Sequence, residues 1–251
     1  MDLELRDRVY VVTGGARGLG RATADCLVAE GAGVVLSGRG ADSLGKARAE
    51  LGDAVETVVA DNADPTTPAR LIAAARRRWG RLDGALISVG GPPKGPVSDI
   101  TDEQWSAAFE SVFLGAVRLA RDIGAELGDG GSLALVLSSS VRAPLADMAI
   151  SNGLRPGLAM VAKTLADELG PRGVRVNGLL PGRIGTERVA ELDAASGDPA
   201  AAREAVISTI PLRRYGEPEE FGRAAAFLLS PASSFVSGAM LPVDGGMLRS
   251  L

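Results

Sequence analysis

A glycine-rich segment, TGGARGLG from Thr13 to Gly20, has residue types and spacing that suit the binding of a phosphate group. It follows a β-branched run, RVYVVTG, and opens an alanine- and leucine-rich stretch with the pattern of a helix. Glycines permit a tight turn and a close backbone approach, and the N–H groups at a helix start favour a pyrophosphate there. The segment therefore predicts a dinucleotide site, with a purely structural loop as the alternative.

The elements that must position this segment alternate along the whole chain. Apolar runs of strand length occur at 8–14, 33–38, 54–61, 82–90, 131–140, 174–182 and 239–246. Amphipathic helical stretches lie between most of them, and the two longest cover 101–128 and 150–170. This alternation is typical of βαβ units around a parallel sheet, so we expect one three-layer, doubly wound α/β domain over 1–251. The segment from Thr186 to Pro211 has no strand pattern, and we expect one or two short helices there that act as a substrate lid.

Composition excludes several classes of partner. The net charge is −4, with arginines and acids interspersed, so no basic face for nucleic acid is evident. No apolar run reaches the roughly 20 residues of a membrane span, and the charged N-terminus MDLELRDR does not resemble a signal peptide. Cys26 is the only cysteine, which fits a reducing compartment, and we expect a cytoplasmic protein. Histidine is absent, so acid–base chemistry must use other residues.

Later motifs complete a resemblance to a known family. PGRIGT follows the sixth predicted strand, and RRYGEPEE and VDGG come near the end of the chain. With the glycine-rich segment, they resemble the short-chain dehydrogenase/reductase family, and in style its 3-oxoacyl-acyl-carrier-protein reductases, from end to end. The resemblance implies a Rossmann fold with a seven-stranded parallel sheet, and a homo-oligomer, in particular a tetramer.

The resemblance also implies which residues bind the cofactor. In the glycine-rich segment these are Thr13, Gly14, Arg17, Gly18, Leu19 and Gly20. Asp61 would accept from the adenine amine with support from the Asn62 backbone, and Gly90 would pass under the nicotinamide ribose. Pro181, Gly182, Ile184 and Thr186 would face the nicotinamide and its carboxamide.

The end of the second strand indicates which nicotinamide dinucleotide is used. An acidic residue there would hold the adenosine 2′-hydroxyl, but the sequence is LSGRG, and Gly38 supplies no carboxylate. Arg39 follows it and Arg17 lies in the glycine loop, so two guanidinium groups could converge on a 2′-phosphate. This favours NADP over NAD, unless both arginines are simply solvated.

The family's catalytic pair is replaced in this chain. The family uses a Tyr and a Lys four apart on one helix, and the run VAKTLADELGPRGVRVNGLLPG fixes that helix without a gap. Ser151 then falls on the Tyr position and Arg155 on the Lys position, while Val112 falls on the family's Asn. The family's strand serine lies within Ser138–Ser140: ungapped counting favours Ser138 and the local pattern favours Ser140.

These replacements remove the family's proton relay. A serine hydroxyl is a much weaker acid than a phenol, and Arg155 stays charged where a lysine can be tuned. Four residues remain as candidate catalytic groups: Ser138, Ser140, Ser151 and Arg155. The two tyrosines, Tyr10 and Tyr215, do not lie at natural places for a substitute; Lys94 and Asp147 are further candidates, with solvated loop residues as the alternative.

Two kinds of function remain open. One is an NADP-dependent oxidoreductase that acts on a carbonyl or an activated double bond, with Arg155 holding an anionic or acyl-carrier-linked small substrate or stabilising an oxyanion. The other is a nucleotide-binding or scaffold protein without turnover. Non-redox chemistry in the same pocket is a weaker third alternative. The fold alone does not choose among these three kinds of function.

Overall fold

The computed structural model describes residues 2–194 and 197–250. Seven parallel strands form one sheet in the order β3-β2-β1-β4-β5-β6-β7. The strands are β1 (Val9–Thr13), β2 (Gly33–Gly38), β3 (Val55–Val59), β4 (Gly84–Ile87), β5 (Ser132–Val136), β6 (Arg175–Pro181) and β7 (Met240–Val243). This confirms the predicted doubly wound parallel sheet. The ends of the predicted domain, Met1 and Leu251, lie outside the described residues.

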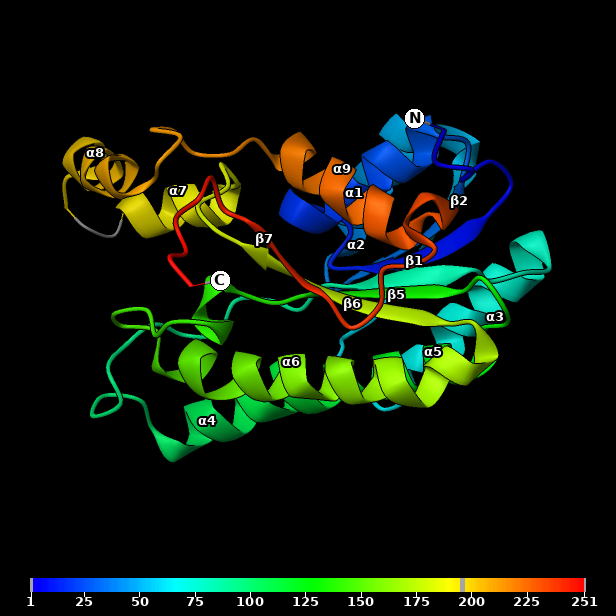
Figure 1. Ribbon diagram of the computed structural model, residues 1–251, viewed down its shortest axis with the longest axis horizontal. Helices are drawn as coiled ribbons and strands as arrows, with labels where there is room; N and C mark the ends of the chain where they lie inside the picture. The colour runs from blue at the N-terminus through cyan, green and yellow to red at the C-terminus, as the bar shows by residue number, and fades with distance from the viewer. Residues whose placement is uncertain (1, 195–196, 251) are drawn as a thin grey trace.

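Helices cover both faces of the sheet, which gives three layers (Figure 1). One layer contains α1 (Gly18–Ala29), α2 (Ala41–Leu51) and α9 (Pro218–Leu229); the other contains α3 (Thr67–Trp79), α5 (Gly115–Glu126) and α6 (Ala149–Leu169). Strands β1 and β5 are buried along their whole length because helices pack on both sides of them. Two large apolar clusters, one on each face, pack the helices against the sheet.

The stretch 101–128, which the sequence predicts as one long helix, is interrupted. It contains α4 (Asp102–Ala108), a π-helical turn (Phe109–Leu114) and then α5. Gly115 follows the turn because a Cβ there would lie 2.3 Å from the Asn62 carbonyl oxygen. Val112 is buried inside the π-helical turn, a rare local structure that often marks functional sites.

Two helices follow β6 at the carboxyl edge of the sheet, where Figure 1 shows them projecting from the body of the molecule. They are α7 (Glu187–Ala194) and α8 (Pro199–Thr209). They occupy the segment expected to be a lid, whose residues 195 and 196 lie outside the described residues; the lid role stays a prediction. In the described part of the chain, no helix has the length and apolarity needed to cross a bilayer.

Candidate functional site

The glycine-rich turn is shaped so that only glycines fit its key positions. Gly14 and Gly18 have φ values of +59° and +56°, and a Cβ on Gly20 would lie 2.4 Å from the Gly14 carbonyl oxygen. Helix α1 begins directly after Arg17, with no side-chain cap and no acidic residue in its first turn. Its first N–H groups and the positive end of its dipole are therefore available to an anion, as a dinucleotide pyrophosphate requires.

This turn lies against the PGRIGT segment, far away in sequence. A Cβ on Gly18 would lie 3.5 Å from Cγ2 of Thr186, and Arg17 Nη1 lies 3.1 Å from Oε2 of Glu187. A cleft of about 370 Å³ opens between the two segments. Its lining comprises Gly18, Arg21, Ala22, Asp25, Gly185, Thr186, Glu187, Glu217, Pro218 and Glu219. The glycine loop and the base of α7 thus form opposite walls of one cleft.

Some predicted cofactor residues are occupied in holding the strand ends together. The Thr13 hydroxyl donates to the Ser88 carbonyl at 2.7 Å and accepts from the Ser88 N–H at 2.8 Å. Asn62 Nδ2 donates to the same carbonyl at 3.3 Å, and the Asp61 carboxylate accepts from the N–H of Ala63. These contacts join the ends of β1, β3 and β4 into one platform.

Other predicted cofactor residues are divided between packing and open space. Ile184 is buried and would contact a Cβ on Gly216, and a Cβ on Gly182 would lie 2.6 Å from that of Asp244. Leu19 is partly buried against the core on the α1 side, and Pro181 ends β6. Gly90 has no neighbour within 4 Å of a Cβ position, so space is open beside it.

The Arg39 guanidinium, just after β2, is available to bind an anion. Arg39 is exposed and makes no ion pair with any described residue, next to Gly38 at the end of β2. Arg17 is engaged by Glu187, although both side chains are about two-thirds exposed. A phosphate near these positions would therefore meet Arg39 directly and would compete with Glu187 for Arg17.

Two serine hydroxyls meet where β5 ends and α6 begins. Ser140 Oγ lies 3.1 Å from Ser151 Oγ and 3.4 Å from the Ser151 carbonyl oxygen, and both serines are buried. Ser138 has a different task, because its side chain accepts from the N–H of Ser140 and caps a short 3-10 helix. Of the candidate strand serines, Ser140 is therefore the one placed against Ser151.

Arg155 lies one turn further along α6 and is only 5% exposed. Its Nη1 donates to the Val136 carbonyl at 2.5 Å, but its buried Nε has no hydrogen-bond partner. Burial lowers the pKa of the Arg155 guanidinium to about 10, so the group remains charged at neutral pH. No ion pair with Arg155 occurs among residues 2–194 and 197–250, which leaves a buried charge without a counter-ion there.

A second buried arginine has more hydrogen-bond partners than Arg155. Arg175 on β6 is 7% exposed and also lacks a carboxylate within the described chain. Its guanidinium donates to the carbonyls of Leu228 at 2.8 Å and Ser230 at 2.9 Å, and to Ser233 Oγ at 2.7 Å. Arg175 therefore serves the fold, whereas the donors of Arg155 are only partly used.

Neither tyrosine hydroxyl is directed to the serine pair. Tyr10 donates to the Leu229 carbonyl at 3.2 Å, and Tyr215 donates to the Asp193 carboxylate at 3.1 Å. Burial raises the pKa of both phenols, which makes them poorer acids. Lys94 is exposed in the loop after β4, where Gly95 pairs with Met148 just before α6.

Aromatic side chains hold the start of α6 in place. A Cβ on Gly153 would lie 3.0 Å from the Trp105 ring, and one on Gly157 would lie 3.1 Å from the Phe113 ring. Glycines at these positions allow α4 and the π-helical turn to approach α6 closely. The segment that carries Ser151 and Arg155 is thus fixed from its other side, a contribution that the family motifs did not indicate.

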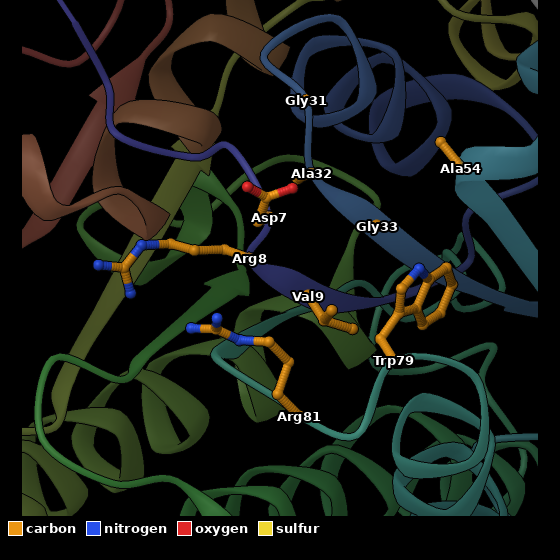
Figure 2. Close-up of a pocket in the computed structure, with 9 residues that line it drawn as sticks. All are labelled: Asp7, Arg8, Val9, Gly31, Ala32, Gly33, Ala54, Trp79 and Arg81. Atoms are coloured by element: carbon orange, nitrogen blue, oxygen red, sulfur yellow. The ribbon is translucent and has the colours of Figure 1, made fainter.

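A further cavity lies at the opposite, amino edge of the sheet. Its volume is about 450 Å³. Figure 2 shows its lining: Asp7, Arg8, Val9, Gly31, Ala32, Gly33, Ala54, Trp79 and Arg81. Arg8 and Arg81 both lie near Asp83, at 3.5 and 2.7 Å, so their charges are already compensated. The strand starts, rather than the strand ends, form this cavity, which separates it from the serine pair.

Comparison with known proteins identifies the class to which this fold and glycine-rich site belong. The family model described as "Enoyl-(Acyl carrier protein) reductase" matches residues 14–248. The chain belongs to the short-chain dehydrogenase/reductase family of oxidoreductases.

Individual relatives match over nearly the whole chain. An uncharacterised oxidoreductase of Mycobacterium tuberculosis is 36% identical, over 96% of this chain and 92% of its own length. Cis-4-hydroxycyclohexanecarboxylate dehydrogenase of Sinomonas cyclohexanicum is 34% identical, over 96% of each chain. The structure of L-sorbose reductase from Gluconobacter frateurii with NADPH and L-sorbose has a TM-score of 0.93 and 30% identity, over 100% of both chains.

Proposed function

We propose that the chain is an NADP(H)-dependent oxidoreductase that acts on a small carbonyl compound or activated double bond through a site rebuilt around Ser140, Ser151 and Arg155. The observation that carries this proposal is the buried hydroxyl pair at 3.1 Å, with an incompletely satisfied guanidinium one turn away. Burying polar groups lowers the stability of the folded protein unless each group has a hydrogen-bond partner, so an unpaired buried donor indicates a role in binding.

The cofactor preference rests on the end of β2 and on the glycine-rich turn. The free N–H groups of α1 suit a pyrophosphate, and the unpaired Arg39 suits a 2′-phosphate in the absence of an acid at Gly38. The similar L-sorbose reductase was solved with NADPH, which agrees with this preference. When bound, the nicotinamide supplies or accepts a hydride.

The serine pair would bind the substrate oxygen rather than give it a proton. When Ser140 donates to Ser151, the Ser151 hydroxyl keeps its own proton free for a hydrogen bond to that oxygen. Arg155 adds a positive charge in a poorly solvated place, where it favours negative charge on the oxygen. Binding and electrostatic stabilisation thus replace acid catalysis in this proposal.

Titration calorimetry with NADPH and NADH, followed by anaerobic incubation with ketones, quinones and enoyl compounds, tests the proposal. We expect tighter binding of NADPH and its oxidation by at least one class of acceptor. Arg155→Met should lower the rate by about 10²-fold, in the range found for loss of one oxyanion donor. NADPH binding without oxidation by any acceptor would contradict the proposal and favour a nucleotide-binding scaffold.

A further inference from the structure

An arginine in the first turn of α7 lies over an exposed pair of glycines at the carboxyl edge of the sheet. Nε and Nη2 of Arg188 lie 3.3 and 3.6 Å from the position of a Cβ on Gly91. Gly90 and Gly91 continue the chain beyond β4, and both are exposed. Nothing beyond its chain neighbours lies within 4 Å of a Cβ position on Gly90. The Arg188 guanidinium therefore borders open space that is reached directly from solvent.

We propose that Arg188 binds an acidic group of the substrate, a carboxylate or a phosphate, and so selects anionic substrates. This inference rests on the proposed function, because it places a substrate beside the nicotinamide, and it narrows the substrate class. Membership of the family leaves the charge of the substrate open.

The guanidinium donors of Arg188 that suit a carboxylate have no partner in the described chain. Nη1 lies 3.4 Å from Oε2 of Glu191, and these two side chains are 49% and 62% exposed. An ion pair as exposed as this is screened by water and salt and contributes little. Nε and Nη2 make no hydrogen bond with any residue in 2–194 or 197–250. The charge of Arg188 is therefore available to a ligand.

Arg81 shows how this edge of a guanidinium binds a carboxylate. Its Nε and Nη2 donate to the two oxygens of Asp83 at 2.8 and 2.7 Å. A bidentate pair of this kind fixes the orientation of the anion as well as its charge. In Arg188 the same two nitrogens lie nearest Gly91, beside the open space. A substrate carboxylate or phosphate can be bound there in the same way.

The contacts of α7 indicate that Arg188 serves a ligand rather than its own helix. Glu187 reaches the glycine-rich turn, where it lies 3.1 Å from Arg17, whereas the next residue, Arg188, lies against Gly91. A cation in the first turn of a helix opposes the helix dipole, so α7 gains no stability from the charge of Arg188. Glycine at 91 leaves the space that the guanidinium occupies, because a Cβ would approach its Nε.

The order of the strands favours the substrate over the cofactor as the source of the anion. The glycine-rich turn after β1 suits the pyrophosphate, and Arg39 after β2 suits a 2′-phosphate. Strand β4 lies on the other side of β1 from β2, between β1 and β5. The phosphates of a dinucleotide thus have partners on β1 and β2, which leaves Arg188 above β4 for an acidic group of the substrate.

Benzoate and benzamide have nearly the same shape and differ in charge, so they provide the first test. Calorimetry with the protein saturated with NADP⁺ should show that benzoate binds about tenfold more tightly than benzamide. Arg188→Met should abolish this preference, and Arg188→Lys, which lacks the planar fork, should retain part of it. Glu191→Gln removes a competing carboxylate and should raise the benzoate affinity by about twofold. Arg77→Met, an exposed change on α3, is the matched control and should leave both affinities unchanged.

Turnover of 4-oxopentanoate and of its methyl ester provides the second test. Arg188→Met should raise the KM for the acid by about tenfold and leave its kcat nearly unchanged, because the arginine contributes to binding and does not touch the reacting carbonyl. The KM for the ester should stay the same in this variant.

Equal binding of benzoate and benzamide by the wild-type protein, no binding of either, or a preference for benzoate that survives Arg188→Met would overturn the inference. A tenfold loss of NADPH affinity in Arg188→Met would also overturn it, because Arg188 would then belong to a phosphate of the cofactor. Failure of the wild-type protein to oxidise NADPH with any acceptor would reject the proposed function, whereas the comparison of benzoate with benzamide would still decide whether Arg188 binds an anion.

Discussion

Arg155 and Arg175 show that burial of a guanidinium can serve two different ends. Arg175 distributes its donors over carbonyl and hydroxyl oxygens between β6 and the end of α9. Arg155 has one carbonyl and an orphaned Nε, so the desolvation cost of its charge is only partly repaid within the described chain. A residue that costs stability in the free protein is a candidate for a role in binding or catalysis.

Replacing the two arginines should therefore change stability in opposite directions. Arg155→Met removes an uncompensated charge and should raise the free energy of unfolding by about 1 kcal/mol. Arg175→Met strands several buried oxygens and should lower it by about 3 kcal/mol. Urea denaturation of the free proteins measures both values. Destabilisation of similar size in the two variants would show that Arg155 is also a structural residue.

Arg39 should determine the preference for NADPH over NADH. Arg39→Asp places a carboxylate beside Gly38, where it can accept from a ribose 2′-hydroxyl and repels a 2′-phosphate. The ratio of NADPH to NADH affinity should fall by about tenfold or more, which calorimetry measures directly. Arg77→Asp, an exposed change on α3, is the control. Equal affinities in the wild-type protein would already contradict the expected preference.

The sequence predicted the neighbourhood of the site better than its contacts. The helix register predicts Ser151 and Arg155 on one face, and the structure places both on the buried face of α6. The sequence could not distinguish Ser138 from Ser140, because the 3-10 turn after β5 decides which hydroxyl lies against α6. The lack of a counter-ion for Arg155 depends on every element around it, so no local pattern indicated it.

At the scale of elements, strands and helices were predictable where the hydrophobic period is clear. Each sheet strand lies within its predicted range, because burial on one or two faces imposes a recognisable apolar run, but β4, β5 and β7 are only about half as long as predicted. The π-helical turn between α4 and α5 was missed. One widened turn barely disturbs a helical period, and the close approach of the Asn62 carbonyl to Gly115 just after it is a tertiary contact that a local pattern does not indicate.

The start of α9 makes a pH-dependent contribution to stability. Arg214 donates to both carboxylate oxygens of Glu220 at 2.7 Å, and Glu220 also accepts from the backbone of Glu217. These bonds, with Arg214 the largest cause, lower the pKa of Glu220 to about 2. In the unfolded chain a glutamate has a pKa of about 4.3, so this stabilisation is complete above that pH and is lost as the pH falls towards 2.

Glu220→Gln should accordingly flatten the dependence of the melting temperature on pH between about 4.3 and 2. The variant should lose stability at neutral pH and approach the wild-type value under acid conditions. Glu219→Gln, a change to the neighbouring exposed carboxylate, is the control. Parallel pH curves for wild type and Glu220→Gln would show that the Arg214 contact contributes nothing measurable.

For the whole molecule, the predicted homotetramer has a candidate surface. Phe109 in the π-helical turn and Met160 on α6 are 43% and 68% exposed, and this turn packs against α6 through Phe113 and Gly157. Exposed apolar groups on adjacent helices favour association with a second copy. Met160→Glu should shift the sedimentation profile towards smaller species, whereas Lys46→Glu on α2 should not. A wild-type monomer at micromolar concentration would refute the prediction.

The fluorescence of the two tryptophans of this chain can report when the site is occupied. Trp105 packs on α6 against Gly153, a residue that lies between Ser151 and Arg155 in the sequence. Trp79 instead lines the cavity at the amino edge of the sheet. A reduced nicotinamide ring absorbs where tryptophan emits, so energy transfer should be stronger from Trp105 than from Trp79. In Trp79→Phe, the remaining emission should be quenched by a larger fraction on NADPH addition than in Trp105→Phe. Trp79→Phe would then provide a single internal fluorophore with which occupation of the site can be followed in real time.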